Sequence, residues 1–428
     1  MTFRDDLEAA SDWVAAYLDS AGERAVVPDV SPGEIRARLP ASPPEQAEPF
    51  VDVLRDLDEV IVPGLALWNH PRFFAYFANT GSEPGILAEL LIAALNVNAM
   101  AWISSPAATE LEQVTLDWLA QLLGLPVGLH GHIEDTASTS TLVALAAARE
   151  LRPGGGVYTS EQANFSVEKC ARILGLETRL VPVDDEFRML ADFPLDDATA
   201  VVATVGTTSS ASVDPVPALA ERCNEAGVWL HVDAAYAGSA AVCPELRWCI
   251  DGVENADSVV VNPHKWLFTP MDCSTFWTRK PEALRAAFST HGDYLAHTDG
   301  AVDFRDYGPA LGRRFRALKL WTVLRCYGRD GLQALIREHV RLAALFEEWV
   351  RAERGWQISA TRHFSTVCFR HEAVDSDEIA RRATETGRIF VATTRLRGQS
   401  VIRLAIGNAF TGEEDIRVAW EVLRECAR

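Results

Sequence analysis

The stretches VWLHVDAAYAG at residues 228–238 and SVVVNPHKW at residues 258–266 decide the fold prediction. Each opens with a short apolar run, residues 228–232 and 258–261, and continues into polar residues. Runs of the same kind occupy residues 157–160 and 200–205. Short continuous apolar runs between turn signals are typical of buried parallel strands. The sequence therefore predicts a sheet that is covered on both faces.

Amphipathic stretches between these runs predict helices. Residues 162–174 end before Gly175, and residues 217–226 end before Gly227. Glycine is favoured just past a helix C-terminus because it adopts the left-handed conformation without strain. The alternation of strands and helices predicts a doubly wound α/β core with a mostly parallel sheet.

The chain divides into three predicted regions. Residues 1–80 begin with a helical pattern and end in an aromatic cluster at residues 68–77, and residues 81–335 form the predicted α/β domain. Residues 336–428 form a small α+β domain, which a long helix over residues 332–353 introduces. Its strand-like runs lie at residues 365–370 and 401–404.

Composition excludes several classes of protein. The 428 residues include 40 Lys and Arg against 60 Asp and Glu, a net charge of −20. No basic excess is available to neutralise phosphates, so nucleic acids and anionic membranes are not expected partners. An apolar share of 48% and a charged share of 23% are ordinary for a globular protein. A small-molecule ligand is the remaining expectation.

The eight cysteines show no spacing typical of a metal site, so no metal is expected. Residues 1–20 lack the uninterrupted apolar region of a secretory signal. The cysteines are therefore interpreted as reduced core thiols of a cytoplasmic protein. The longest apolar stretch, residues 86–103, contains Glu89, Asn96 and Asn98, which favours a buried or interface helix over a membrane span.

Polar residues that could bind one cofactor follow the predicted strands. Each is weak evidence alone, because an aspartate at a strand end often caps a turn and a lone lysine is often solvated. Ligands of open α/β sheets bind at the carboxyl ends of the strands, where these residues converge. Pyridoxal phosphate (PLP) requires a lysine, a carboxylate and a helix N-terminus for its phosphate. The candidates are Asp233, Lys265, Asn262, His264, Thr208, and Ala137 and Ser138 before a helix at residues 139–149.

With these residues in view, the sequence resembles the group II PLP-dependent decarboxylases, close to the aromatic-L-amino-acid decarboxylases. The segments that carry the resemblance are SSPAATELE (104–112), TASTSTLVALAAAR (136–149), YTSEQANFSVEK (158–169), HVDAAYAGSAAVCPELR (231–247), NPHKWL (262–267) and LGRRFRALKLW (311–321). The resemblance implies the fold type I of aspartate aminotransferase. It also implies an intertwined homodimer, with residues 1–80 packing on the partner.

The resemblance assigns roles by position. Lys265 matches the Schiff-base lysine, Asp233 the partner of the pyridine nitrogen, and Ala235 the small residue beneath the ring. Thr208 matches the residue near the ring hydroxyl. Ala137, Ser138, Asn262 and His264 match the phosphate side, and a core histidine is the alternative for His264. The residues that match the aromatic substrate pocket are Trp68, Tyr76, Phe77 and Trp102, with core or dimer packing as the alternative. Asn79 could bind a ring hydroxyl or cap a turn.

Two positions depart from the family pattern. Asn164 stands where the family has a histidine over the ring, and Phe304 stands where a mobile loop carries a catalytic tyrosine. That tyrosine resembles the acid that protonates Cα after CO2 leaves. Neither Phe304 nor Asn164 is such an acid, so O2 could oxidise Cα instead. Related aromatic aldehyde synthases carry one or the other change. The resemblance thus implies an aryl acetaldehyde, CO2, NH3 and H2O2 as products.

Two alternatives stay open. Tyr307, three residues beyond Phe304, or a water could supply the proton and leave a simple decarboxylase that produces the arylalkylamine. A third hypothesis is that the protein is a paralogue that binds PLP but catalyses no reaction. The substrate cannot be ranked among Phe, Tyr, Dopa and Trp, because Ala78 stands where the decarboxylases usually have proline. Residues 290–309 lack apolar periodicity and are predicted to form a mobile lid.

Overall fold

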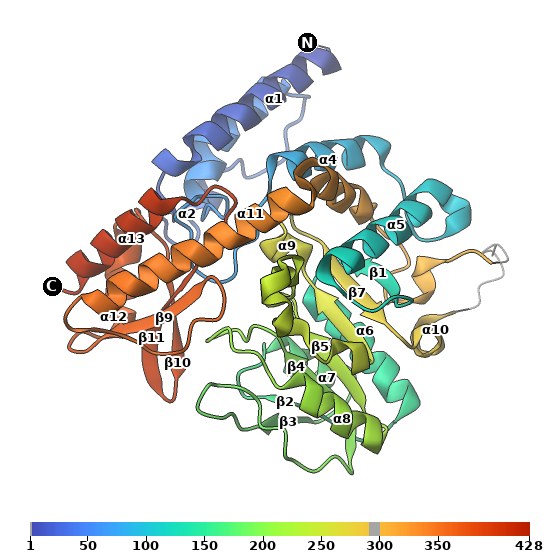
Figure 1. The fold of residues 1–428 in the computed structure, drawn as a ribbon. Helices are drawn as coiled ribbons and strands as arrows, with labels where there is room; N and C mark the ends of the chain where they lie inside the picture. Colours follow the sequence, from blue (N-terminus) through green and yellow to red (C-terminus); the bar gives the residue numbers. More distant parts are fainter. Residues whose placement is uncertain (1, 291–299) are drawn as a thin grey trace. The chain divides into compact units, whose positions relative to one another are not determined.

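A computed structural model gives the fold and describes residues 2–290 and 300–428 (Figure 1). The chain forms two compact units. The central unit comprises Asn79–Ala344 and Ala360–Cys368, and the terminal unit comprises Met1–Ala78, Leu345–Ser359 and Phe369–Arg428. The predicted division at residues 80 and 335 into three regions stays a prediction.

The central unit is built on a seven-stranded sheet of order β1-β7-β6-β5-β4-β2-β3. The ladders β3-β2-β4-β5-β6 are parallel, and β7 runs antiparallel to both of its neighbours, β6 and β1. This confirms the mostly parallel sheet. The strands are β1 (His130–Glu134), β2 (Gly156–Ser160), β3 (Thr178–Val181), β4 (Ala198–Thr204), β5 (Trp229–Asp233), β6 (Ser258–Val261) and β7 (Ser274–Thr278).

Helices connect and cover these strands. Helix α6 packs across β4, β5, β6 and β7 and also contacts α7 and α10. The helix predicted from residue 162 begins at Ser166 instead, because the Asn164 side chain accepts a hydrogen bond from the Ser166 N–H at 3.0 Å and holds a turn there. The helices are α4 (Glu83–Leu95), α5 (Pro106–Leu123), α6 (Ala137–Leu151), α7 (Ser166–Ile173), α8 (Val216–Ala226), α9 (Pro263–Trp266) and α10 (Pro281–Phe288).

A second sheet has the order β10-β11-β9-β8. Its strands are β8 (Trp356–Ile358), β9 (Thr366–His371), β10 (Ala392–Leu396) and β11 (Gln399–Ala405), which confirms both predicted strand-like runs. The rings of Trp356 and Trp420 meet at 5.1 Å in an aromatic core beside it. The remaining helices are α1 (Phe3–Ser20), α2 (Glu34–Arg38), α3 (Phe50–Asp56), α12 (Ser376–Glu385) and α13 (Glu413–Cys426).

The long element α11 (Arg316–Ala352) joins two helices across a kink, and the predicted helix at residues 332–353 corresponds to the second of them. The element is interrupted at Gly328, whose φ of +61° belongs to the left-handed region that glycine tolerates. The sequence pattern predicted the helix after Gly328, which ends at Ala352, and did not predict the helix before Gly328.

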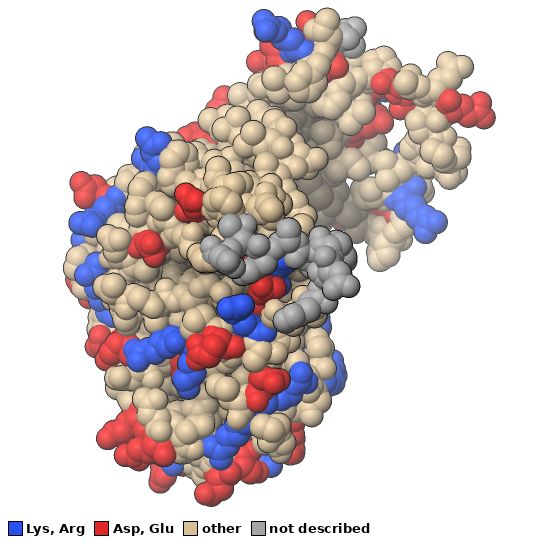
Figure 2. Space-filling view, turned by 90° about the vertical axis from the view of Figure 1, so that its right-hand side faces the viewer, with Lys and Arg blue, Asp and Glu red and all other residues tan. Residues whose placement is uncertain are grey.

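The cysteine prediction needs one correction. All eight are free thiols and six are buried, but Cys326 is exposed and Cys426 is partly exposed. Within residues 2–290 and 300–428, no helix is long and apolar enough to cross a membrane, and no cluster of His, Cys, Asp and Glu suits a metal ion. Acidic and basic side chains are interspersed on the face shown in Figure 2.

Candidate active site

The carboxyl ends of β5 and β6 bring the predicted lysine and aspartate to one edge of the sheet. Asp233 is the last residue of β5 and pairs in register with Val260 of β6, which leads to Lys265 on α9. The Asp233 carboxylate is 5% exposed and accepts the Ala235 N–H at 3.1 Å. Burial raises the pKa of Asp233, and the positive charge of Lys265 opposes that rise. A cationic ring nitrogen would stabilise this buried carboxylate.

His264 and Asn262 form a buried polar pair beside Lys265. The Cys273 N–H donates to His264 Nδ1 at 3.0 Å, and His264 Nε2 lies 3.2 Å from Asn262 Nδ2. Burial and the Lys265 charge lower the pKa of His264 to about 3, so the ring is neutral and carries its proton on Nε2. Asn262 Oδ1 is buried without a hydrogen-bond partner in the described part of the chain.

This orphaned amide atom fits a phosphate site. If the amide turns its oxygen toward the His264 Nε2 proton, its NH2 group becomes a buried donor that needs an acceptor. Ala137 and Ser138 begin α6, and the N-cap residue Thr136 makes no capping hydrogen bond through its side chain. The positive end of a 15-residue helix thus lies after β1, which points the same way as β6. These groups suit the phosphate of PLP.

Asn164 and Thr208 are brought together. Asn164 Nδ2 donates to Thr208 Oγ1 at 3.3 Å, while its Oδ1 accepts the Ser166 N–H. Thr208 follows β4, so strand order explains how residues 44 positions apart meet. Ala235 is buried just after Asp233, and its role beneath the ring stays a prediction. Neither side chain of the Asn164–Thr208 pair is an acid at neutral pH.

Phe304 lies elsewhere in the central unit. Its ring is 1% exposed and lies against the Arg313 guanidinium at 4.6 Å, and against His130 at 6.5 Å. His130 begins β1, about 13 Å from its carboxyl end at ~3.3 Å per residue. The cofactor residues lie at the carboxyl ends of the strands. The structure therefore does not bring Phe304 to Lys265 within the same chain.

The predicted lid is only partly described, because residues 291–299, including His291 and His297, lie outside the described residues. Its later part is packed: the Trp102 N–H donates to Asp303 Oδ1 at 3.0 Å, and the Arg305 N–H donates to the Met100 carbonyl. Lid mobility stays a prediction.

The predicted substrate residues fall in both units. In the terminal unit, Trp68 stacks on Tyr76 at 5.7 Å, and Phe77 lies beneath the Arg403 guanidinium at 4.1 Å. Tyr76 is 53% exposed with a φ of +58°. Phe390 meets the Tyr76 ring edge-on at 5.9 Å. Nothing in the sequence signalled Phe390 or Arg403, because each lies more than 300 residues from its partner.

Asn79 and Trp102 belong to the central unit. Asn79 Nδ2 lies 3.4 Å from Met271 Sδ, and Trp102 Nε1 donates to Glu110 at 2.9 Å. Neither Met271 nor Glu110 was predicted from the sequence. The substrate roles of Asn79 and Trp102 stay predictions.

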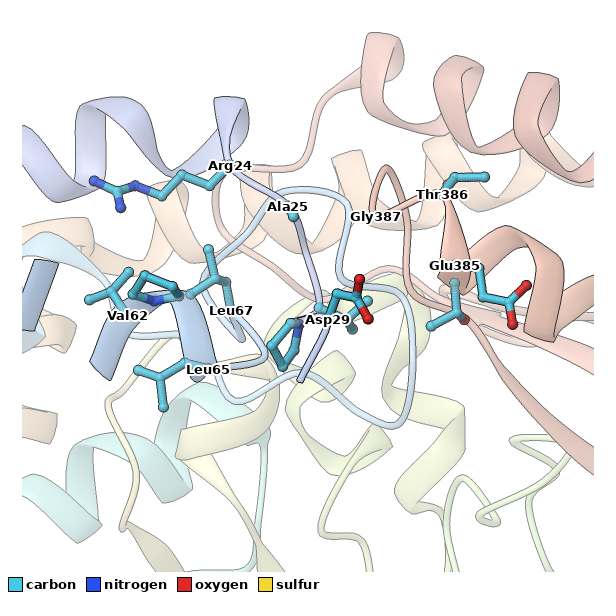
Figure 3. Close-up of a pocket in the computed structure, with 13 residues that line it drawn as sticks. Arg24, Ala25, Asp29, Val62, Leu65, Leu67, Glu385, Thr386 and Gly387 are labelled. Carbon is cyan, nitrogen blue, oxygen red and sulfur yellow. The ribbon is translucent and has the colours of Figure 1, made fainter. Parts of the chain in front are cut away.

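A separate pocket of about 840 Å³ opens in the terminal unit (Figure 3). Its lining includes the apolar side chains of Val62, Leu65 and Leu67 and the acidic residues Asp29 and Glu385. Lys265 and Asp233 belong to the central unit, so this pocket is distinct from the candidate active site.

A lysine and a buried aspartate at adjacent strand ends, beside a helix N-terminus, form the arrangement that a PLP-dependent enzyme requires. The model of the pyridoxal-dependent decarboxylase conserved domain matches residues 32–153 and 155–372. The chain therefore belongs to the pyridoxal-dependent decarboxylase family, and PLP is its cofactor.

Known relatives confirm this assignment over nearly the full length. Aromatic-L-amino-acid decarboxylase of Catharanthus roseus is 38% identical over 465 residues, covering 99% of this chain and 93% of that protein. The crystal structure of Oryza sativa TDC with PLP and tryptamine has a TM-score of 0.95 at 36% identity, covering 99% and 97% of the two chains. Rhodiola rosea 4-hydroxyphenylacetaldehyde synthase has a TM-score of 0.94 at 33% identity, covering 100% and 98%. These matches confirm fold type I.

Proposed function

We propose that this PLP-dependent decarboxylase acts on an aromatic L-amino acid and couples loss of CO2 to oxidative deamination. The products are an aryl acetaldehyde, CO2, NH3 and H2O2. The observation that carries the proposal is that neither Asn164 nor Phe304 can donate a proton at neutral pH. The substrate class rests on the relatives named aromatic-L-amino-acid decarboxylase, and the aldehyde on similarity to the aldehyde synthase.

The chain supplies the groups that would hold the cofactor. Lys265 would bind it covalently through its amine, Asp233 would face its ring nitrogen, and Asn262 with the start of α6 would hold its phosphate. When bound, PLP supplies an electron sink that allows the bond between Cα and the carboxylate to break. The buried Asp233 carboxylate would keep the ring nitrogen protonated, which strengthens that sink.

The fate of Cα then depends on the residues around it. A general acid near Cα typically accelerates protonation by ~10²–10⁴-fold. The Asn164 amide, held by Thr208 and by the Ser166 N–H, is not an acid of that kind. With protonation slow, Cα loses two electrons to O2, which takes two protons to become H2O2. Water then releases ammonia and leaves the aldehyde, so each substrate consumes one O2 and one water.

A simple decarboxylase is the second candidate. The named decarboxylase relative and the Tyr307 hydroxyl favour it. In this structure, however, Tyr307 stacks on His130 at 4.1 Å, and burial raises the pKa of its phenol. A buried phenol with a raised pKa is a weaker acid than a free one.

We further propose a homodimer as the working form. Helix α4 exposes Leu87, Leu90, Leu91 and Leu95, with Leu87 at 62%. A row of exposed leucines on one helix supports a protein interface. Helix α4 ends at Leu95 and so covers only the first part of the apolar stretch at residues 86–103, for which a buried or interface helix was predicted. Light scattering after size exclusion should give twice the 47.0 kDa chain mass. Cytoplasmic localisation stays a prediction.

A stoichiometry experiment decides between the two activities. Purified protein with added PLP is supplied separately with Phe, Tyr, Dopa and Trp, while O2, H2O2, NH3, CO2, amine and aldehyde are followed together. Equimolar O2 uptake, NH3 and aldehyde would support the proposal. Amine and CO2 without O2 uptake would refute it and support the simple decarboxylase.

A further inference from the structure

One face of β1 carries a row of ionisable side chains, partly buried at its first residue and buried at the other two. His130, His132 and Glu134 share this face because alternate residues of a strand point the same way. His132 is fully buried, and its Nε2 lies 3.2 Å from Glu134 Oε1. None of the three was assigned a part in the reaction.

The segment that carries Phe304 lies along this face. It includes the short helix η8 (Phe304–Asp306), and the Phe304 ring lies 6.5 Å from His130. Tyr307 stacks on His130 at 4.1 Å with 28° between the ring planes, and lies 6.3 Å from His132. The segment therefore follows β1 from its first residue toward its last.

Gly308 lies against Glu134, the last residue of β1. A Cβ placed on Gly308 would lie 2.3 Å from Glu134 Oε1, which is closer than atoms approach without displacement. The Glu134 carboxylate therefore occupies the space that a side chain at position 308 would need. A side chain at position 308 would therefore displace either the end of the Glu134 side chain or the segment itself.

Arg313 fixes the Phe304 end. Its guanidinium lies over the Phe304 ring, pairs with Glu112 at 2.7 Å and donates to the Ile133 carbonyl of β1 at 2.8 Å. Burial lowers the pKa of His130 to about 3, so an uncharged imidazole faces Arg313 and the Tyr307 ring at neutral pH. His130 therefore does not repel the positively charged Arg313 guanidinium.

We infer that His130, His132 and Glu134 form a β1 clamp that positions the segment with Phe304 and Tyr307. These are positioning residues, because they act through that segment. The inference rests on the proposed function: by keeping the Tyr307 hydroxyl packed on β1, the clamp withholds a proton donor and favours the aldehyde over the amine. A loosened clamp should raise the amine share.

Glycine substitutions test the clamp. Gly308→Ala should speed amide hydrogen exchange at residues 303–308 by about tenfold or more, because the added methyl group displaces the Glu134 carboxylate from its place against the segment. It should also raise the ratio of amine to aldehyde. Glu134→Ala removes one member of the clamp, so it should change both measurements in the same direction as Gly308→Ala. The matched control is Gly312→Ala, whose Cβ would meet only Asn98 Nδ2 at 3.8 Å.

A second pair of variants does not depend on Gly308. His130→Phe keeps a ring against Tyr307 and should preserve slow exchange, whereas His130→Ala should accelerate it. Unchanged exchange in both Gly308→Ala and His130→Ala would overturn the clamp. Faster exchange with an unchanged product ratio would overturn its effect on the products. A wild type that makes only amine without O2 uptake would refute the proposed function, while hydrogen exchange would still decide whether the clamp exists.

Discussion

Restoring two proton donors should convert the enzyme toward amine production. The change is the double variant Asn164→His and Phe304→Tyr. At position 164 the change removes the side-chain acceptor for the Ser166 N–H at the start of α7. This loss should lower the free energy of unfolding by about 1 kcal/mol. At position 304 the ring is 1% exposed, so a new hydroxyl without a partner there costs about 1–3 kcal/mol.

This cost lowers the free energy of unfolding, whereas the gain lowers the barrier to protonation of Cα. A positioned acid is worth ~10²–10⁴-fold, which is about 2.7–5.4 kcal/mol at ~1.36 kcal/mol per tenfold. The ratio of amine to aldehyde should therefore rise by about 10²-fold or more in the double variant. Each single variant should give a smaller rise, because proton delivery would use both groups.

The assay measures amine, aldehyde and O2 uptake in one reaction with purified holoenzyme. Phe165→Tyr is the matched control, since it adds a hydroxyl to a ring beside Asn164 that is 76% exposed. The control should leave the ratio unchanged. An unchanged ratio in the double variant, with PLP absorbance intact, would refute the reasoning that missing donors select the aldehyde.

Three further outcomes are expected. Arg313→Met should lower the free energy of unfolding in urea by about 3–5 kcal/mol, because it leaves Glu112 buried and unpaired; a loss below about 1 kcal/mol would contradict this. Burial lowers the pKa of His231 from 6.5 to about 3, so between these values the unfolded chain binds an extra proton and stability falls as pH falls. In unfolding measured at several pH values, His231→Leu should reduce the dependence of the free energy of unfolding on pH. The same pH dependence in the variant and the wild type would contradict this. Asp233→Asn should lower kcat by about 10²-fold or more while the absorbance of PLP on Lys265 persists, and an unchanged kcat would exclude the ring-nitrogen role.

Local sequence predicted the strands that are buried on both faces. Strands β2, β4, β5 and β6 are continuous apolar runs, and all four were predicted close to their observed bounds. Strand β1, with the sequence HGHIE, was missed because its histidines and glutamate are polar. Their burial depends on the segment around Tyr307, which lies more than 170 residues away.

The sequence by itself indicated the cofactor, because Asp233 and Lys265 lie where apolar strands end and those carboxyl ends meet at one edge of a parallel sheet. The family followed from the resemblance of segments such as NPHKWL (262–267). It also showed that Asn164 and Phe304 lack exchangeable acidic protons. Only the tertiary structure placed Phe304 at the amino end of β1 and Gly308 against Glu134. These contacts join distant parts of the chain. They depend on the order of strands in the sheet and on the close packing of side chains, which no local pattern of residues encodes.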